Sequence, residues 1–196
     1  MAKKGYHHGN LREALIEATL TLIVARGPQG FTLSGAARQA GVTPAAIYRH
    51  FAGRDDLVAE AARQGYELFA AMLSEVDALP GAPRVRAMAQ AYLAFAERHP
   101  GHYVAMFESG IDLARRPALS EAAGRARDVL HGACDGMNAD AAEVTAHVWS
   151  LSHGVVELYL RNSAGLSHPP EARAMLSRAL DTYLSGLVSP AAQTSR

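Results

Sequence analysis

Apolar residues recur at helical spacing through almost the whole chain, and this periodicity limits the fold more than any other feature. Leu11, Leu15, Ala18 and Leu22 follow one another at steps of four, three and four residues, which places them on one face of a helix. The alternation of apolar and polar residues that marks a half-buried strand does not appear. The sequence therefore predicts an all-α protein.

Breakers and caps divide this pattern into separate helices. Gly27-Pro28 ends the first helix, while Thr32 and Thr43-Pro44 have the residue types that begin new ones. Leu79-Pro80-Gly81-Ala82-Pro83 is the clearest break. Beyond the first helix, we expect helices near 33–39, 44–50, from about 54 to the break, and near 84–99, 101–109, 118–135, 140–163 and 171–188.

Charge is distributed unevenly, although the formal net charge of the chain is zero. Residues 1–54 carry seven basic and two acidic side chains, a net charge of +5, and the remainder carries −5. A basic head on an acidic body implies an anionic partner at the head. We expect three parts: a helix-turn-helix domain with a basic arm at 1–55, a helical ligand-binding and dimerisation domain at 56–188, and a flexible tail at 189–196.

Cysteine usage and hydropathy indicate the compartment. Cys134 is the only cysteine, so an intramolecular disulfide is impossible, which suits a reducing cytosol. The N-terminus has no apolar core of a signal peptide, and no apolar run approaches the length of a membrane span. These observations predict a soluble, cytoplasmic protein without a membrane partner.

Residues 33–52 have the content of a helix-turn-helix. Ala37 is small where two helices cross, and Gly41 suits a turn with positive φ. Val42 and Ile47 fill the space between the helices, and the third helix can then enter a DNA major groove. The polar groups around it, including the arm at Lys3 and Lys4, are suited to holding phosphates.

The segment GFTLSGAARQAGVTPAAIYRHFAGRDDLV resembles the DNA-binding signature of the TetR/AcrR transcriptional regulators, and the resemblance extends over residues 10–66. It implies phosphate contacts through Thr32, Thr43, Tyr48, His50 and Arg54, with residues 43–49 facing the bases. The chain departs from the pattern at Gly35, and Ala45 and Ala46 cannot form bidentate hydrogen bonds to bases. The predicted DNA-binding residues are Lys3, Lys4, Thr32, Thr43, Pro44, Ala45, Ala46, Tyr48, Arg49, His50 and Arg54.

Aromatic, methionine and histidine side chains concentrate in the second half of the chain. Met88, Tyr92, Phe95 and His99 share one helix face and suit an adaptable apolar pocket, although the same stripe can also be plain core. Trp149, His153 and Gly154 resemble the Trp-x-x-x-His-Gly motif of one C-terminal class of these regulators, called WHG, in which Gly154 would admit a neighbouring helix. The predicted ligand-binding residues are Phe69, Met72, Met88, Tyr92, Phe95, His99, Tyr103, Met106, Phe107, Trp149 and His153.

Two apolar seams near the C-terminus predict a dimer interface. Their alternative is burial within one chain, but a helix-turn-helix that reads a two-fold operator needs a dimer. The seam residues are Val144, Val148, Leu151, Val155, Leu158, Leu176, Leu180, Tyr183 and Leu187.

Together these features predict a homodimeric repressor that releases double-stranded operator DNA when a small apolar or aromatic effector binds its C-terminal domain. The alternative is a DNA-binding or architectural protein that responds to no ligand. An enzyme is a distant third, because the sequence has no HExxH, no CxxC pair, no G-x-S-x-G and no glycine-rich phosphate loop. We therefore expect no catalytic residue, no metal and no cofactor.

Overall fold

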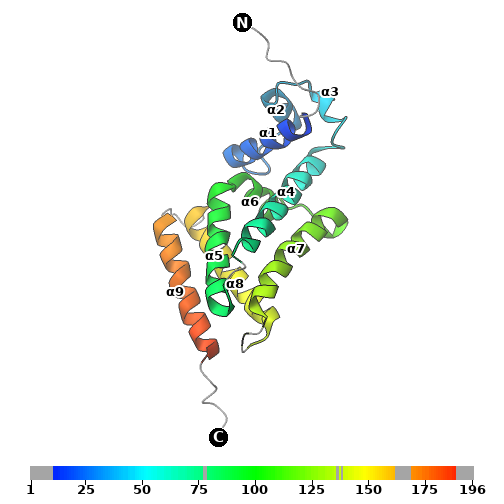
Figure 1. Ribbon diagram of the computed structural model, residues 1–196. Helices are drawn as coiled ribbons and strands as arrows, with labels where there is room; N and C mark the ends of the chain where they lie inside the picture. The colour runs from blue at the N-terminus through cyan, green and yellow to red at the C-terminus, as the bar shows by residue number, and fades with distance from the viewer. Residues whose placement is uncertain (1–10, 77–78, 136, 138, 162–168, 189–196) are drawn as a thin grey trace. The chain divides into compact units, whose positions relative to one another are not determined.

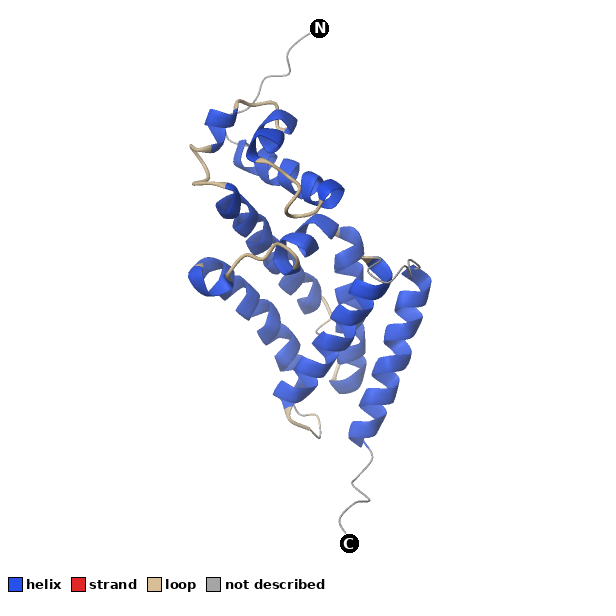
Figure 2. Cartoon of the chain, turned by 180° about the vertical axis from the view of Figure 1, so that it is seen from behind, coloured by secondary structure: helices blue, strands red, loops and turns tan. Residues whose placement is uncertain are grey.

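A computed structural model describes residues 11–76, 79–135, 137, 139–161 and 169–188 of the chain, and all regular structure in these ranges is helical (Figure 2). The predicted all-α class is confirmed. The helices are α1 (Leu11–Arg26), α2 (Leu33–Gln39), α3 (Pro44–Ile47), α4 (Arg54–Ser74), α5 (Gly81–Arg98), α6 (Pro100–Phe107), the 3-10 turn η1 (Leu113–Arg115), α7 (Pro117–Cys134), α8 (Ala141–Val155), the π-helix η2 (Val156–Leu160) and α9 (Pro169–Val188).

The chain divides into two compact units that are not continuous in sequence. Unit 1 combines Met1–Glu67 with His99–Ala123, and unit 2 combines Leu68–Arg98 with Gly124–Arg196. Helices α4 and α7 each have residues in both units. This division follows packing, so the functional domains expected at 1–55, 56–188 and 189–196 stay a prediction.

In unit 1, α1 packs against both α2 and α6 (Figure 1). The contact with α6 depends on Gly101, because a Cβ atom there would lie 2.9 Å from the Leu20 carbonyl oxygen. On α4, a Cβ atom at Gly65 would lie 2.6 Å from the Met106 sulfur of α6. Helix α6 therefore packs closely on α1 and α4 at two glycines.

In unit 2, α5, α8 and α9 pack against one another. Two ion pairs join α5 to α9 at the surface of this packing. Arg86 Nε donates to Asp181 Oδ1 at 2.7 Å, and Arg173 donates to Glu97. The part of α7 from Gly124 onwards belongs to the same unit.

Several helix bounds differ from the sequence expectation. Helix α3 ends at Ile47 and not near His50, and the helix expected to run from 140 to 163 changes at Val156 into a π-helix. The buried face of α4 runs along its whole length, through Val58, Ala62, Tyr66, Phe69 and Leu73. Phe69 and Leu73 are buried while Leu68 is 40% exposed, because the helix buries its larger aromatic side chain in the core of unit 2.

Candidate functional site

The joint between α2 and α3 has the geometry of a helix-turn-helix. Thr32 caps α2, since its hydroxyl accepts a hydrogen bond from the Gly35 amide at 3.1 Å. Gly41 has a φ of +73° in the turn, a conformation that costs glycine little. The Val42 amide then donates to the Ala37 carbonyl at 2.9 Å, and Ala37 is fully buried. These features agree with the sequence analysis.

Helix α3 is a single short turn whose far end is closed by Ile47. The amides of His50 and Phe51 both donate to the Ile47 carbonyl, at 2.8 and 3.0 Å. Ile47 and Phe51 are buried under this turn. The expected side-chain cap at Thr43 is wrong, because its hydroxyl accepts no capping hydrogen bond and Pro44 alone marks the helix start. The Thr43 hydroxyl is thus free of that intrahelical role.

Most of the predicted DNA-contacting side chains lie on the exposed surface around α3. Tyr48 is 64% exposed, which is far more than a core aromatic shows. Phe51, by contrast, is buried. Lys3 and Lys4 lie outside the described residues. The predicted contact residues that are exposed are Thr32, Thr43, Pro44, Ala45, Tyr48, Arg49 and His50, and Ala46 is half-buried.

Arg54 at the start of α4 already has partners within the chain. Its guanidinium donates to the Pro28 carbonyl and to Asp55 Oδ1, the latter at 3.1 Å, and lies 4.9 Å from the Phe31 ring centroid. Its side chain is only 27% exposed. Arg54 therefore fixes the loop before α2, and any DNA phosphate would compete with Asp55 for it.

A half-buried carboxylate, that of Glu60, ties α1 to α4. Glu60 accepts from Arg12 Nη1 at 2.9 Å and from both Nε and Nη2 of Arg63, at 2.9 and 2.8 Å. Burial alone would raise the Glu60 pKa, but the hydrogen bonds and charges of Arg63 and Arg12 lower this pKa to about 2. The Arg12 guanidinium also lies 5.3 Å from the Phe51 ring centroid. This network is not predictable from the sequence, because Arg12 lies 48 positions from Glu60.

The predicted ligand-binding residues separate into two groups, one in each unit. The eleven predicted residues therefore do not all belong to a single unit. Unit 1 contains His99, Tyr103, Met106 and Phe107, and unit 2 contains Phe69, Met72, Met88, Tyr92, Phe95, Trp149 and His153.

In unit 2 the predicted residues form a contiguous aromatic cluster around Phe69. Its ring centroid lies 5.0 Å from that of Tyr92, 5.1 Å from Phe95 and 5.9 Å from Trp149. Tyr92 Oη and His153 Nδ1 are 3.0 Å apart, a hydrogen bond at the edge of the cluster. Phe69, Tyr92 and Phe95 are buried, whereas Trp149 and His153 are half-buried. The cluster therefore has an apolar centre and a polar edge.

In unit 1 the remaining residues pack between α4 and α6. Phe107 contacts Tyr103 at a centroid distance of 4.9 Å and Tyr66 at 5.8 Å. Burial, with the neighbouring His99, lowers the pKa of His102 to about 4, so this imidazole is neutral at neutral pH. Tyr66 was not expected here from the sequence.

The residues of the predicted dimer seams are only partly accessible at the surface of this chain. Five of these residues are buried in this single chain, where α8 and α9 pack on α5 and on each other. Among the residues that the structure describes, none packs closely on Gly154, since a Cβ atom there would meet nothing within 4 Å. The seam residues in the core of unit 2 are Val144, Val148, Val155, Leu176 and Leu180. Those that are exposed or half-buried are Leu151, Leu158, Tyr183 and Leu187.

The described ranges also bear on metal binding and on membrane insertion. No group of three or more histidine, cysteine, aspartate or glutamate side chains could hold a metal ion there. No helix within the same ranges is both long and apolar enough to cross a membrane.

The fold and this surface define a helix-turn-helix DNA-binding protein with a helical C-terminal region. Two family models match the chain. The model of the bacterial regulatory proteins of the tetR family matches residues 15–61, and that of the tetracyclin repressor-like C-terminal domain matches residues 85–183. Trp149, His153 and Gly154 lie within the second match.

Individual proteins are also similar to this chain in sequence or in structure. The chain is 24% identical over 181 residues to the uncharacterized HTH-type transcriptional regulator YobS of Bacillus subtilis (strain 168), covering 92% of this chain and 94% of YobS. A protein of unknown function from Rhodococcus sp. RHA1 has a similar structure, with a TM-score of 0.79 and 25% identity over 95% of this chain and all of that one. FadR from Bacillus subtilis, solved in complex with stearoyl-CoA, shares the fold with a TM-score of 0.72 at 16% identity, over 89% of this chain and 98% of FadR.

The chain belongs to the TetR family of bacterial transcriptional regulators, and it is a DNA-binding protein. The resemblance inferred from the sequence is thereby confirmed.

Proposed function

We propose that the protein is a homodimeric repressor that releases operator DNA when a small apolar or aromatic effector binds its C-terminal region. The observation that carries this proposal is the aromatic cluster of unit 2. Its central residue, Phe69, lies on α4, the helix that begins in unit 1 next to the helix-turn-helix. As a regulator of bacterial genes it would act in the cytoplasm.

The DNA-binding face would hold phosphates through the hydroxyl of Tyr48, the imidazole of His50 and the hydroxyl of Thr43, all of which are exposed. Such contacts position a protein on DNA but carry no sequence information. Base reading would rest on the methyl group of Ala45 against thymine and on Arg49. The arm at Lys3 and Lys4 would add phosphate contacts of its own.

The effector would bind at the Phe69 cluster in unit 2. Apolar rings at the centre and one tyrosine–histidine pair at the edge fit a ligand that is mostly hydrocarbon and carries one polar group. The stearoyl-CoA bound to the similarly folded FadR is a ligand with a long apolar part. Because the rings contact one another, a ligand has to separate Trp149 from Phe69 and Tyr92.

Helix α4 offers a physical route from this cluster to DNA. It is continuous from Arg54 to Ser74, so its first turns belong to unit 1 while Phe69 belongs to the cluster of unit 2. A ligand that displaces Phe69 acts on a helix whose other end is fixed to the loop before α2 by Arg54. In a dimer, the recognition helices must match half-sites about 34–36 Å apart or a multiple of that distance. A small displacement of α4 would spoil that match.

The dimer would form through the outer faces of α8 and α9. Leu151, Gly154 and Leu158 follow at steps of three and four, so they share one face of the α8–η2 segment, and Leu158 is 43% exposed. On α9, Met175 is 37% exposed and Tyr183 hydrogen-bonds to His147 of α8 at 2.9 Å. These two faces adjoin at that bond and would bury together in a helix bundle.

Trp149 is the only tryptophan, so its fluorescence reports directly on the proposed effector site. We expect small apolar or aromatic compounds that bind the chain to change this emission, and Phe69→Ala to weaken their binding. Leu184→Ala, in the core of unit 2 but outside the cluster, is the matched control for loss of packing. A chain that binds DNA while no such compound alters Trp149 emission or DNA affinity would be a ligand-independent DNA-binding protein.

A further inference from the structure

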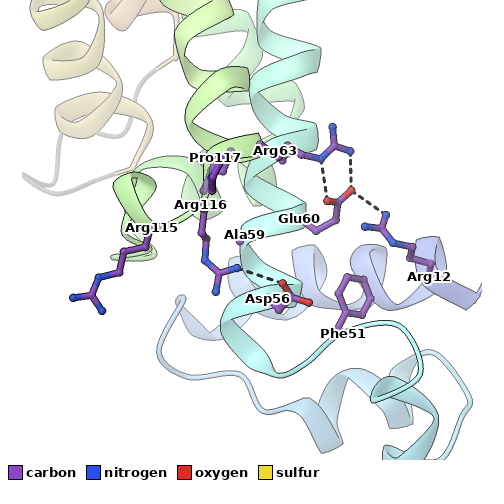
Figure 3. Close-up of a pocket in the computed structure, with 11 residues that line it drawn as sticks. Arg12, Phe51, Asp56, Ala59, Glu60, Arg63, Arg115, Arg116 and Pro117 are labelled. Atoms are coloured by element: carbon purple, nitrogen blue, oxygen red, sulfur yellow. Dashed lines mark hydrogen bonds and ion pairs between the residues drawn. The ribbon is translucent and has the colours of Figure 1, made fainter.

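A cleft of about 310 Å³ lies within unit 1, and the aromatic cluster contributes nothing to it (Figure 3). Its walls come from α1, the segment before α4, the first turns of α4, and the junction of η1 with α7. Three arginines and two carboxylates line it together with apolar side chains, and a fourth arginine, Arg115, points away from the others in Figure 3.

In both carboxylates of the cleft, each oxygen already accepts a hydrogen bond. Both oxygens of Glu60 accept hydrogen bonds, from Arg12 and Arg63. Asp56 accepts from Arg116 Nη1 at 3.3 Å through one oxygen and from the Ala52 amide at 3.1 Å through the other. An added anion would therefore not need to strip either carboxylate of its partners.

Two of the arginines keep unused donors. Arg12 and Arg116 each engage a carboxylate through Nη1 alone, so Nε and Nη2 of both side chains have no partner among the described residues. Arg63, in contrast, spends Nε and Nη2 on Glu60 and Nη1 on Glu67. A guanidinium edge with Nε and Nη2 both available is the geometry that binds a phosphate or carboxylate through two parallel hydrogen bonds.

The start of α7 adds donors beside Arg116. In the described part of the chain, the first amide of this helix to donate a hydrogen bond is that of Ser120, to the Arg116 carbonyl at 2.9 Å. The amides of Ala118 and Leu119 therefore have no helical acceptor. Both residues line the cleft. The cleft also has apolar lining residues, and Phe51, Ala59 and Leu119 among them are all buried to 6% exposure or less.

We propose that this cleft binds a small organic phosphate. Arg116 and Arg12 would donate hydrogen bonds to its phosphate oxygens, or one of them to a second acceptor on the same ligand. The organic part of the ligand would lie against Phe51 and Leu119. The cleft size falls at the lower end of the range of about 300–1,000 Å³ for small-molecule sites. Such a ligand would contact α1, α4 and α7 at once. It would form a second binding site on the regulator, located in the unit that carries the helix-turn-helix.

The test is a calorimetric titration of the full chain with phenyl phosphate at constant ionic strength, with phenol as the uncharged control. We expect saturable binding of phenyl phosphate and none of phenol. Arg116→Gln and Arg12→Gln should each weaken binding by about tenfold or more, since each removes charge-assisted hydrogen bonds. Arg116→Lys should bind between the native chain and Arg116→Gln, because it keeps the charge but loses the fork.

Arg127→Gln is the matched control, since it removes one positive charge from the exposed side of α7 outside the cleft. Its phenyl phosphate affinity should stay within about twofold of the native value. Equal weakening by Arg127→Gln, or no saturable binding to the native chain, would overturn the proposal. If Arg116→Gln fails to fold, Arg12→Gln and Arg116→Lys decide the question.

Titration with duplex DNA separates a small ligand from the phosphates of the DNA backbone. We expect Arg116→Gln and Arg127→Gln to bind duplex with similar affinity. Duplex binding that is weakened by Arg116→Gln alone, in a chain that does not bind phenyl phosphate, would assign these arginines to DNA and would refute a small-molecule site.

Discussion

The ion pairs of Glu60, which join α1 to α4, give a prediction about stability. Both the size of the stability change and its pH dependence follow from this one carboxylate. Glu60 is 12% exposed and holds Arg12 and Arg63 together. Glu60→Gln keeps the shape of the side chain but removes its negative charge. We expect the variant to fold with a lower free energy of unfolding, because two arginines then lose their shared counterion.

The magnitude follows from the pKa of Glu60. Lowering this pKa from the ordinary value of 4.5 to about 2 corresponds to roughly 3 kcal/mol at about 1.4 kcal/mol per pKa unit. Arg12 is 42% exposed and Arg63 27%, so solvent screens part of the interaction. We therefore expect Glu60→Gln to cost roughly 1–2 kcal/mol near neutral pH.

The sign of the pH dependence is fixed by the lowered pKa. The contribution of Glu60 is fully present above the unfolded pKa of 4.5 and is lost as the pH falls towards about 2. Urea unfolding followed by circular dichroism should thus show a native-minus-variant difference that is constant near neutral pH and falls below half by about pH 3. Glu17→Gln, an exposed position on α1, should change stability by less than about 0.5 kcal/mol. A difference that does not shrink at low pH would refute the ion-pair account.

Further predictions concern packing, assembly and DNA. Gly101→Ala should destabilise the chain by about 1–3 kcal/mol in urea unfolding because its Cβ would press on Leu20, whereas Gly132→Ala, with open space around it, should not. Leu158→Arg should lower the dimer fraction in sedimentation and leave the fold intact. Leu180→Glu should unfold the chain, since Leu180 is fully buried within it. A Leu158→Arg dimer as strong as the native one would exclude the Leu158 face of α8 and η2 from the interface. Tyr48→Phe should weaken both specific and non-specific duplex binding by about three- to tenfold, and Tyr159→Phe should not; an unchanged Tyr48→Phe affinity would remove Tyr48 from the interface.

The sequence was informative where local chemistry decides the structure. Thr32, Gly41 and the small residue Ala37 define the helix-turn-helix because a cap, a positive φ and a close helix crossing each restrict the residue type. Helical periodicity likewise identified the stripe that contains Tyr92 and Phe95. These signals act within one or two helical turns, so they can be read without a fold.

The rest depended on contacts between segments distant in sequence. Periodicity shows that Val148 and Leu180 are buried, but it cannot show whether the burying partner is the same chain or a second copy. The same limit applies to Arg12, whose partner Glu60 lies 48 positions away, and to the cleft at Arg116. Arg54 looked like a free phosphate ligand because nothing in the sequence reveals its bond to the Pro28 carbonyl.

In the proposed function, the aromatic cluster and the DNA-binding face influence each other. The most direct measurement is the affinity of a compound that quenches Trp149, titrated with and without saturating operator duplex. We predict that operator weakens binding of the compound by roughly 5–150-fold, and that the compound weakens operator binding by the same factor, because linkage is reciprocal. Equal affinities in the two titrations would show that the cluster is not coupled to DNA binding and would contradict the account.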